Sequence, residues 1–353
     1  MKEPKVAIII SNFNGASIYY ENLCILDTCL KTIEKTKYTN YKIYIADDSS
    51  TDESNEFVHN NFPQVEFIIN KPNGGYAQNM NNTIKYALKH FKPDFLMLMN
   101  NDIIVKNKLW LLELVSTIKQ YKNAGIVGCQ LLYPNNIINN AGELNDSGNS
   151  IHNIRGRGEP YKGKYDNIEE VSLVTGAAFL IKKEIFTKVG YLDEVFFMGS
   201  DDTDIVLRSK DAGFKIIYNG KVKLIHLDSF TSNNLKDDSL RMKTSLYCER
   251  GAIYFILKWR KRYNLTHLIK LYLEHVIGIY FSITKVNSNT RNLKNLHMRY
   301  KLIKLQNNIE FPFIKRVILG IKYEIEGLYI YIKYHKIISS QKFIILKNTR
   351  KVL

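Results

Sequence analysis

Residues 6–15 read VAIIISNFNG, and this pattern organises the whole first third of the chain. Five apolar residues come first, and four of them are β-branched, which favours a buried strand over Val6–Ile10. Polar residues and a glycine follow at once, as is typical of a turn. The stretch therefore predicts a buried strand that ends in a polar turn.

The same combination of an apolar run and a polar stop recurs three times before residue 103. We expect these strands over Tyr41–Ala46, Val65–Ile69 and Phe95–Met99. Segments with helical spacing separate the strands, at residues 21–36, 52–60 and 77–90. Alternating strands and helices predict the α/β class, with a mainly parallel central sheet flanked by helices on both faces.

The second half of the sequence is less regular. Residues 133–170 are rich in glycine and predict loops, whereas residues 202–212 predict a helix whose first turn is acidic. Phe214–Tyr218 and Lys221–His226 predict two short strands. Beyond about residue 237 the pattern is helical.

Composition places the chain among globular proteins. Its 353 residues are 45% hydrophobic and 24% charged, and this length accommodates one large domain plus a second region. No window reaches the roughly 18–20 uninterrupted apolar residues of a membrane span. The apolar run at Val6–Ile10 is shorter than the core of about 7–15 residues in a signal peptide. The four cysteines form no CxxC pair, so we expect a reducing cytosol and no structural zinc site.

The net charge of +16 is confined to one part of the chain. Residues 235–353 contain 24 Lys and Arg against 7 Asp and Glu, whereas residues 1–234 are close to neutral. A basic segment that is also rich in aromatic residues attracts polyanions, such as an anionic membrane surface. A solvated, lysine-rich helical surface remains the alternative. No nucleic-acid recognition motif is present, so no nucleic-acid partner is expected.

Polar residues follow each of the four early strands. They include Asn12, Asp47, Asn73 and Asp102. In open α/β sheets, ligands bind at the carboxyl ends of the strands. These four residues are therefore candidates for ligand contacts.

Two acidic sites suggest chemistry, each with a structural alternative. Asp102 follows a hydrophobic strand beside two asparagines, so it either holds a hard cation or merely ends the strand. The cluster Asp201–Asp204 has three carboxylates in four residues, which suits a general base or a helix N-terminus. His226 follows an apolar stretch and is either a ligand or a structural residue.

A glycine-containing turn, Asn73-Gly74-Gly75, precedes a predicted helix and permits close approach to a phosphate. The sequence has neither GxGxxG after its first strand nor GxxxxGK[ST]. A dinucleotide-dependent dehydrogenase and a P-loop nucleotidase are therefore disfavoured.

Taken in order over about residues 4–231, the motifs resemble glycosyltransferase family 2, and most closely its rhamnosyltransferase-like subgroup. The matching segments are Ile8–Gly15 ("NYNG"), Asp47–Ser54 ("DNGSTDGS"), Asn73–Asn81 ("NxGFAxxxN"), Leu98–Asp102 ("LNND", a form of the DxD motif), Gly176–Ile181 ("GAxxLI"), Asp193–Gly213 ("DExFF…EDxDLxxR…G") and His226 with Ser229 or Ser232 ("H…S").

This sequence departs from the family pattern at three positions. Asp201 stands where the family usually has Glu, and Gly199 stands where it usually has an aromatic residue. The DxD motif is reduced to one acid, Asp102. The first two changes are expected to alter the acceptor pocket, whereas Asp202 is retained.

The resemblance implies a GT-A type nucleotide-diphospho-sugar transferase fold and an inverting sugar transfer by single displacement. Asp202 would accept the proton of the acceptor hydroxyl. Asp102 and His226 would bind a divalent metal, Mn²⁺ or Mg²⁺, on the diphosphate of a UDP- or dTDP-sugar donor. The residues implied to hold the nucleotide sugar are Asn12, Asp47, Asn73, Gly75, Asn81 and Asn101. Those implied to shape the acceptor side or to support the base are Asp201, Asp204, Arg208 and Gly176.

We expect a catalytic domain over residues 1–234 and a basic, aromatic-rich helical region over residues 235–353. Family acceptors are often glycans or lipid-linked glycans, so the second region is expected to hold the enzyme at the cytoplasmic, inner face of the cell membrane. Homodimerisation through its aromatic surfaces is the competing interpretation. A sugar-1-phosphate nucleotidyltransferase and a non-catalytic scaffold are the alternative functions.

Overall fold

The computed structural model describes residues 3–144, 154–227, 247, 250–251 and 254–262. The chain divides into two compact units. The first comprises Met1–Asp146, Ile154–Phe197 and Asp201–Asn234, and the second comprises Ser147–Asn153, Met198–Ser200 and Leu235–Leu353. Most of the expected basic region lies outside the described residues, and its extent stays a prediction. Within it, residues 254–258 are helical and Arg260–Arg262 form a 3-10 turn.

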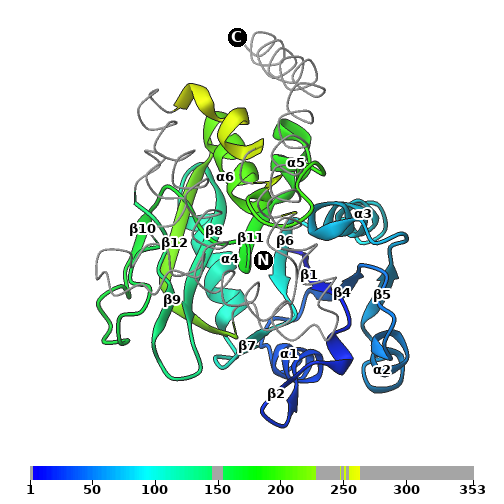
Figure 1. The fold of residues 1–353 in the computed structure, drawn as a ribbon. Helices are drawn as coiled ribbons and strands as arrows, with labels where there is room; N and C mark the ends of the chain where they lie inside the picture. The colour runs from blue at the N-terminus through cyan, green and yellow to red at the C-terminus, as the bar shows by residue number, and fades with distance from the viewer. Residues whose placement is uncertain (1–2, 145–153, 228–246, 248–249, 252–253, 263–353) are drawn as a thin grey trace, which may run out of the picture. The chain divides into compact units, whose positions relative to one another are not determined.

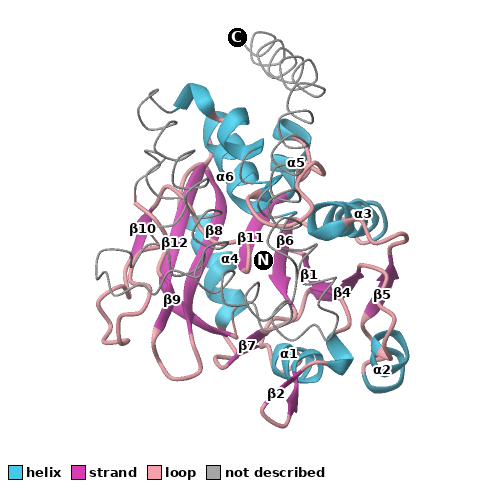
Figure 2. Ribbon diagram, viewed as in Figure 1, coloured by secondary structure: helices cyan, strands magenta, loops and turns pink. Residues whose placement is uncertain are grey.

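The first unit is built on one ten-stranded sheet, flanked by helices (Figure 1, Figure 2). The strands are β1 (Val6–Asn12), β2 (Tyr19–Tyr20), β3 (Leu23–Cys24), β4 (Tyr41–Asp47), β5 (Glu66–Ile69), β6 (Phe95–Asn100), β7 (Ile103–Val105), β8 (Ala124–Leu132), β9 (Ile138–Asn140), β10 (Ile168–Glu170), β11 (Ala178–Lys182) and β12 (Lys215–His226). The helices are α1 (Ile25–Ile33), α2 (Ser54–Asn61), α3 (Gly75–His90), α4 (Trp110–Gln120), α5 (Lys183–Val189) and α6 (Asp201–Asp211), with a 3-10 turn at Gly15–Ser17.

The expected α/β class is confirmed, but the sheet is mixed instead of mainly parallel. Its main path runs β10-β12-β8-β11-β6-β1-β4-β5, while β7 pairs with β12 and β9 pairs with β8. β6, β1, β4 and β5 are parallel, as expected from the early βα units. β11 is antiparallel to both β6 and β8, so it inverts the strand direction at the middle of the sheet. The start of β11 therefore meets the end of β6 at one edge.

The two faces of the sheet are covered by different helices. Val6, Ile8 and Ile10 of β1 point into a hydrophobic core with residues of α1 and α4, such as Leu30 and Leu114. The opposite face at β4 receives α3, because the ring of Tyr44 contacts that of Tyr86 with centroids 6.3 Å apart. Burial on both faces explains why these strands are uninterrupted apolar runs.

The prediction of two short strands near the C-terminal end of the sheet was wrong. Residues 215–226 form the single strand β12, with an irregularity in its pairing to β8 between Asn219 and Lys223. The helix expected over 21–36 is shorter, because the hairpin of β2 and β3 precedes α1. The region 133–170, expected to be loops, contains the short strands β9 and β10.

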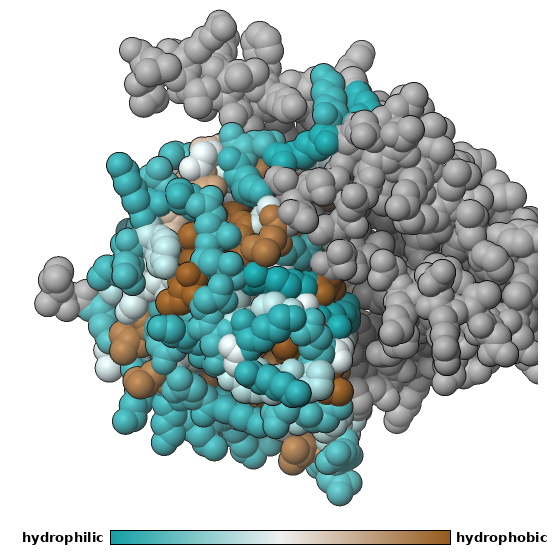
Figure 3. Space-filling view, turned by 90° about the vertical axis from the view of Figure 1, so that its left-hand side faces the viewer, coloured by the Kyte–Doolittle hydropathy of each residue, from teal (hydrophilic) through white to brown (hydrophobic). Residues whose placement is uncertain are grey.

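The surface shown in Figure 3 is mostly hydrophilic over its described residues, with apolar residues in small groups among charged ones. The exposed large hydrophobic side chains of the described residues are Tyr19, Leu23, Ile69, Leu109, Leu112 and Leu144. No helix in the described part of the chain has both the length and the apolar character that crossing a bilayer requires.

Candidate active site

The sheet brings the first group of predicted residues together. Asn12 at the end of β1 pairs in register with Asp47 at the end of β4, and Ser11 pairs with Asn100 of β6. These three strands run parallel, so their polar ends meet at the same edge, as the sequence predicts.

Asn12 is the centre of a buried hydrogen-bond chain at this edge. Its Nδ2 donates to Asp47 Oδ1 at 2.8 Å, and its Oδ1 accepts from Asn101 Nδ2 at 2.9 Å. Asp47 also accepts from the hydroxyl of Ser50 at 2.5 Å and from the Ser50 backbone N–H at 2.9 Å. A side chain at Gly15 would collide with both asparagines, so this glycine is needed for their approach. Both Asp47 oxygens thus serve first to shape the loop around Ser50.

Asp48, which the sequence analysis did not single out, holds the glycine turn. Its carboxylate accepts from the backbone N–H groups of Gly74 at 2.9 Å and Gly75 at 3.0 Å. Asn73 Nδ2 donates to the Asp48 carbonyl at 2.9 Å. Burial raises the pKa of Asp48, and these N–H donors partly offset the rise. The only sequence signal for this role was its position beside Asp47.

Gly75 is a packing position as well as part of this turn. It has φ +80°, and a Cβ there would lie 2.7 Å from the Phe197 ring. The next residue, Tyr76, donates its backbone N–H to the Phe197 carbonyl at 2.7 Å. Gly75 therefore lets the start of α3 approach the segment that precedes α6.

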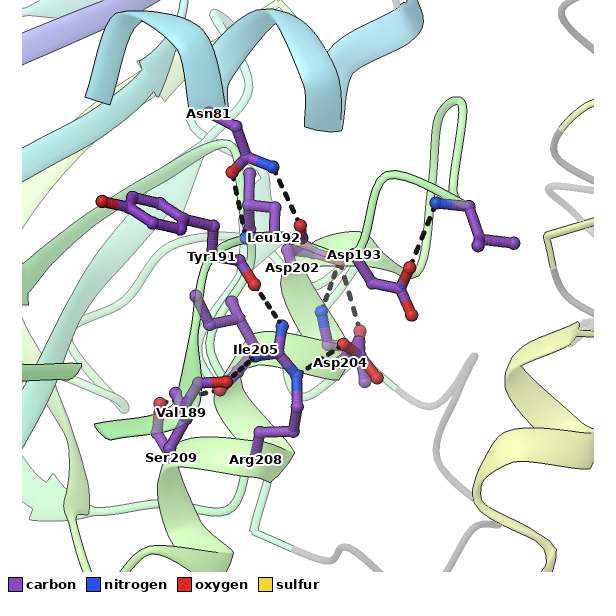
Figure 4. A network of polar contacts seen from close by, with 12 residues as sticks. Asn81, Val189, Tyr191, Leu192, Asp193, Asp202, Asp204, Ile205, Arg208 and Ser209 are labelled. Atoms are coloured by element: carbon purple, nitrogen blue, oxygen red, sulfur yellow. Dashed lines mark hydrogen bonds and ion pairs between the residues drawn. The ribbon is translucent and has the colours of Figure 1, made fainter. Parts of the chain in front are cut away.

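The structure places Asn81 differently from its predicted role in donor binding. It is 1% exposed, and its Nδ2 donates to the Leu192 carbonyl at 2.9 Å and to Glu194 at 2.8 Å. Its Oδ1 accepts the Leu192 N–H at 3.0 Å, which completes a reciprocal pair with that backbone (Figure 4). Both amide donors are used, so Asn81 fixes the loop between α5 and α6.

Asp102 and His226 come together although 124 residues separate them. β7 pairs with the end of β12, and the Leu227 N–H donates to the Asp102 carbonyl at 3.1 Å. Both side chains are buried, and His226 Nε2 lies 3.4 Å from Asp102 Oδ1. His226 Nδ1 faces Asn139 Oδ1 at 3.4 Å.

This pair fits part of a divalent-metal site. Asp102 Oδ1 is buried and accepts no hydrogen bond within the described ranges, so it has coordination capacity in hand. No group of three or more His, Cys, Asp or Glu capable of metal binding occurs among the described residues. A metal that takes most of its ligands from water and substrate phosphates needs only one or two protein groups. The two side chains are compatible with such an ion.

Asp202, the expected general base, lies at the N-terminus of α6 and is held by backbone donors. Its Oδ2 accepts the Gly176 N–H at 2.6 Å, and its Oδ1 accepts the Thr203 N–H at 2.7 Å. The Ala177 carbonyl accepts the Asn100 N–H at 3.0 Å, which ties the loop before β11 to the end of β6. This contact links the Asp202 position to the edge that carries Asp102.

Asp201, Asp204 and Arg208 surround Asp202 from below. Asp201 is 3% exposed and Asp204 is 0% exposed. Arg208 bonds Asp204 at 2.8 Å and donates to the carbonyls of Val189 at 2.7 Å and Tyr191 at 2.8 Å (Figure 4). Arg208 and Asp204 thus brace α6 against the loop after α5, which agrees with the predicted supporting role more than with acceptor contact.

Tyr76 is a further residue that sequence reasoning missed. Its hydroxyl is buried and has no hydrogen-bond partner among the residues described. Burial raises the pKa of Tyr76 well above its ordinary value, and the charges of Asp201 and Asp202 add to the rise. The hydroxyl therefore stays protonated near the acidic cluster. A tyrosine at this position had no distinctive signal in the sequence.

Curated relatives match mainly the sheet-forming part of the chain. The O-antigen biosynthesis protein RfbC of Myxococcus xanthus is 25% identical over 232 residues, which are 64% of this chain and 17% of that protein. The low-salt glycan biosynthesis hexosyltransferase Agl10 of Haloferax volcanii is 26% identical over 182 residues, 52% of this chain and 57% of that protein. The chain thus spans less than two thirds of these curated relatives.

Solved structures support the same fold. The mannosyltransferase PcManGT from Pyrobaculum calidifontis, in complex with GDP-Man and Mn²⁺, has a TM-score of 0.51 at 14% identity, over 99% of this chain and 88% of that chain. GalNAc-T7 with UDP, GalNAc and Mn²⁺ has a TM-score of 0.50 at 16% identity, over 77% and 54% of the two chains. The expected GT-A type fold is confirmed.

A family model decides the classification. The model for glycosyl transferase family 2 matches residues 8–190, more than half of the chain. The match spans β1 to α5 and includes the ends of β1, β4 and β6, where the buried polar residues meet. The chain belongs to glycosyl transferase family 2.

Proposed function

We propose that the protein is an inverting glycosyltransferase that moves a sugar from a UDP- or dTDP-linked donor to a hydroxyl of a glycan or lipid-linked glycan. One observation carries this proposal: Asp202 and the Asp102–His226 pair lie at one sheet edge, linked through the Gly176–Ala177 segment and Asn100. A proton acceptor and a site for diphosphate are the two parts that a single displacement needs.

In this reaction the acceptor hydroxyl oxygen attacks the anomeric carbon of the sugar. The bond from that carbon to the diphosphate oxygen breaks, and the nucleotide diphosphate leaves with the electron pair. A carboxylate oxygen of Asp202 takes the hydroxyl proton. The N–H donors of Gly176 and Thr203 hold this carboxylate in place, so it needs no rearrangement at the moment of attack.

We assign the diphosphate end to Asp102 and His226. A bound Mn²⁺ or Mg²⁺ would supply Lewis-acid stabilisation of the leaving diphosphate. Support for this assignment comes from the buried, available oxygen of Asp102 and from the Mn²⁺ present in both structural neighbours.

The nucleotide is proposed to lie along the ends of β1 and β4, against Asn12, Asp47, Asn73 and Asn101. Asp48 and Gly75 hold the turn beside it. Asn81 is proposed as a positioning residue, because its amide is committed to the Leu192 backbone. The names of RfbC and Agl10, which refer to O-antigen and glycan biosynthesis, favour a role in surface polysaccharide or glycoconjugate synthesis.

A thermal-shift screen tests the proposal. UDP, dTDP, GDP and their sugars are each added with and without Mn²⁺ or Mg²⁺, and a ligand of the folded state raises Tm. We expect a metal-dependent rise with one nucleotide class, lost in Asp102→Ala and kept in Asp211→Ala, which changes the exposed end of α6. Absence of any rise with wild-type protein would favour the scaffold alternative.

We also propose that the basic region over residues 235–353 holds the enzyme at the inner face of the cell membrane. Its charge supports this, as do aromatic–cation pairs among its described residues, such as Lys258 over Tyr254 and Arg262 over Trp259. Flotation with liposomes containing anionic lipid tests the proposal at low and high salt. Failure to float at low salt, together with a dimer by light scattering, would favour self-association.

A further inference from the structure

Gln130 on β8 is a buried amide that the proposed mechanism does not use. Its side chain is 0% exposed, and neither Oε1 nor Nε2 has a hydrogen-bond partner in the described part of the chain. Leaving a buried amide without partners costs stability, so such groups are rare in folded proteins and call for a physical reason. A ligand that completes the hydrogen bonds is one such reason.

The strand pattern places Gln130 on the face opposite the main core. Val127, Cys129 and Leu131 point into the core cluster with α1 and α4. Successive residues of a strand point to opposite faces, so Gly128 and Gln130 face the other side.

The neighbouring strands place Gln130 next to the site. β8 lies between β11 and β12 in the sheet (Figure 1). Gly128 pairs with Phe179 of antiparallel β11, and continuing this register brings Gln130 beside Ala177. Ala177 follows Gly176, which holds Asp202. On its other side Gln130 pairs with Lys223 of β12, three residues before His226.

The groups around Gln130 do not satisfy its amide. Lys223 is committed elsewhere, since its Nζ pairs with Asp166 at 3.0 Å and lies over the Tyr161 ring at 5.3 Å. The pairing of β12 with β8 is irregular between Asn219 and Lys223, so the ladder changes beside Gln130. Such irregularities are frequent next to active sites.

We infer that the Gln130 amide binds a hydroxyl of the transferred sugar. This inference rests on the proposed function. In a single displacement, the sugar ring lies between the proton acceptor and the diphosphate. Gln130 occupies the corresponding place in the sheet, between the strand that follows Gly176 and the strand that carries His226. An amide offers both a donor and an acceptor, which suits one sugar hydroxyl.

The test compares affinities for a nucleotide diphosphate and for its sugar, with the UDP, dTDP and GDP series as probes. Isothermal titration of wild-type protein and Gln130→Met gives the ratio of the two Kd values, which isolates the sugar. Met has nearly the volume of Gln and lacks its polar atoms. We expect the ratio to fall roughly tenfold in Gln130→Met, with an unchanged Kd for the nucleotide diphosphate.

A matched control and a stability measurement complete the design. Cys129→Ala changes the adjacent residue on the opposite face, and it is expected to leave the ratio unchanged. The Tm of ligand-free Gln130→Met is expected to equal or exceed that of wild type, because an unpaired buried amide is removed. A lowered Tm with an unchanged Kd ratio would assign Gln130 a purely structural role and overturn the inference.

Two further outcomes separate the inference from the function on which it rests. If wild-type protein binds the nucleotide sugar no more tightly than the nucleotide diphosphate, or if the ratio is the same in Gln130→Met, the inference is wrong while the function stands. If wild-type protein binds neither ligand with Mn²⁺ or Mg²⁺ present, the proposed function itself fails and the inference falls with it.

Discussion

Asp202 and Gly176 are joined by a 2.6 Å hydrogen bond, in which the backbone N–H of Gly176 donates to Asp202 Oδ2. The approach is so close that a Cβ at position 176 would lie 2.5 Å from Asp202 Cβ and 2.8 Å from Oδ2. Real side chains do not tolerate such distances. The glycine therefore sets where the proposed base sits relative to the end of β6.

Gly176→Ala is expected to displace Asp202 and to lower kcat by at least about tenfold, with nucleotide affinity retained, because a displaced base loses its geometry. Steady-state kinetics and titration with the nucleotide measure the two effects. Gly190→Ala is the control, since open space surrounds its Cβ but φ is +84°. That change should lower Tm and leave kcat alone. Equal kcat losses in both variants would mean that stability alone explains the effect.

Asp202→Asn removes the proton acceptor while keeping the shape of the side chain. We expect kcat to fall by about 10²–10⁴-fold, the usual contribution of a general base, with little change in the Kd for the donor. Asp211→Asn, at the exposed far end of α6, should behave as wild type. Near-normal turnover in Asp202→Asn would remove Asp202 from the mechanism.

The parallel half of the sheet could be predicted because each of its strands is an apolar run that stops abruptly at polar residues. Asn12 and Asp47 followed from that rule and do meet at one edge. β12 was misread because its Asn219-Gly220 step looks like a turn. In the structure Asn219 satisfies the irregularity itself, by donating to Thr117 at 2.8 Å and accepting from the Lys221 N–H at 3.0 Å.

Long-range partners explain the other differences. The prediction for Asn81 lacked the information that Leu192, 111 positions away, takes both ends of its amide. Asp47 and Asp48 are adjacent, and only the fold shows that Asp48 is the one facing Gly74 and Gly75. Asp102 and His226 are an intermediate case, because a motif suggested each and the pairing of β7 with β12 brings them together.

Two ion pairs in this chain have the same spacing and length but opposite burial. Arg208–Asp204 and Lys31–Asp27 are both i,i+4 pairs at 2.8 Å, and Asp204 is fully buried whereas the Lys31 side chain is 62% exposed. Arg208→Met should cost about 3–5 kcal/mol of unfolding free energy, because Asp204 is left charged and unpaired. Lys31→Met should not change Tm measurably. Urea denaturation of both variants measures the contrast, and equal losses would contradict it.

Cysteine reactivity gives a test of the core that does not depend on activity. Burial raises the pKa of Cys129 to about 12, and it also raises the pKa of the half-buried Cys24. Thiols react as thiolates, so at pH 8 only about one Cys129 in ten thousand is reactive in the folded protein. Its labelling by iodoacetamide should be far slower than in urea, where the thiol returns to its ordinary pKa. The rate should rise with pH until about 12. Mass spectrometry of labelled peptides follows each site, and native Cys129 labelling as fast as in urea would show that the β8–α4 core is open.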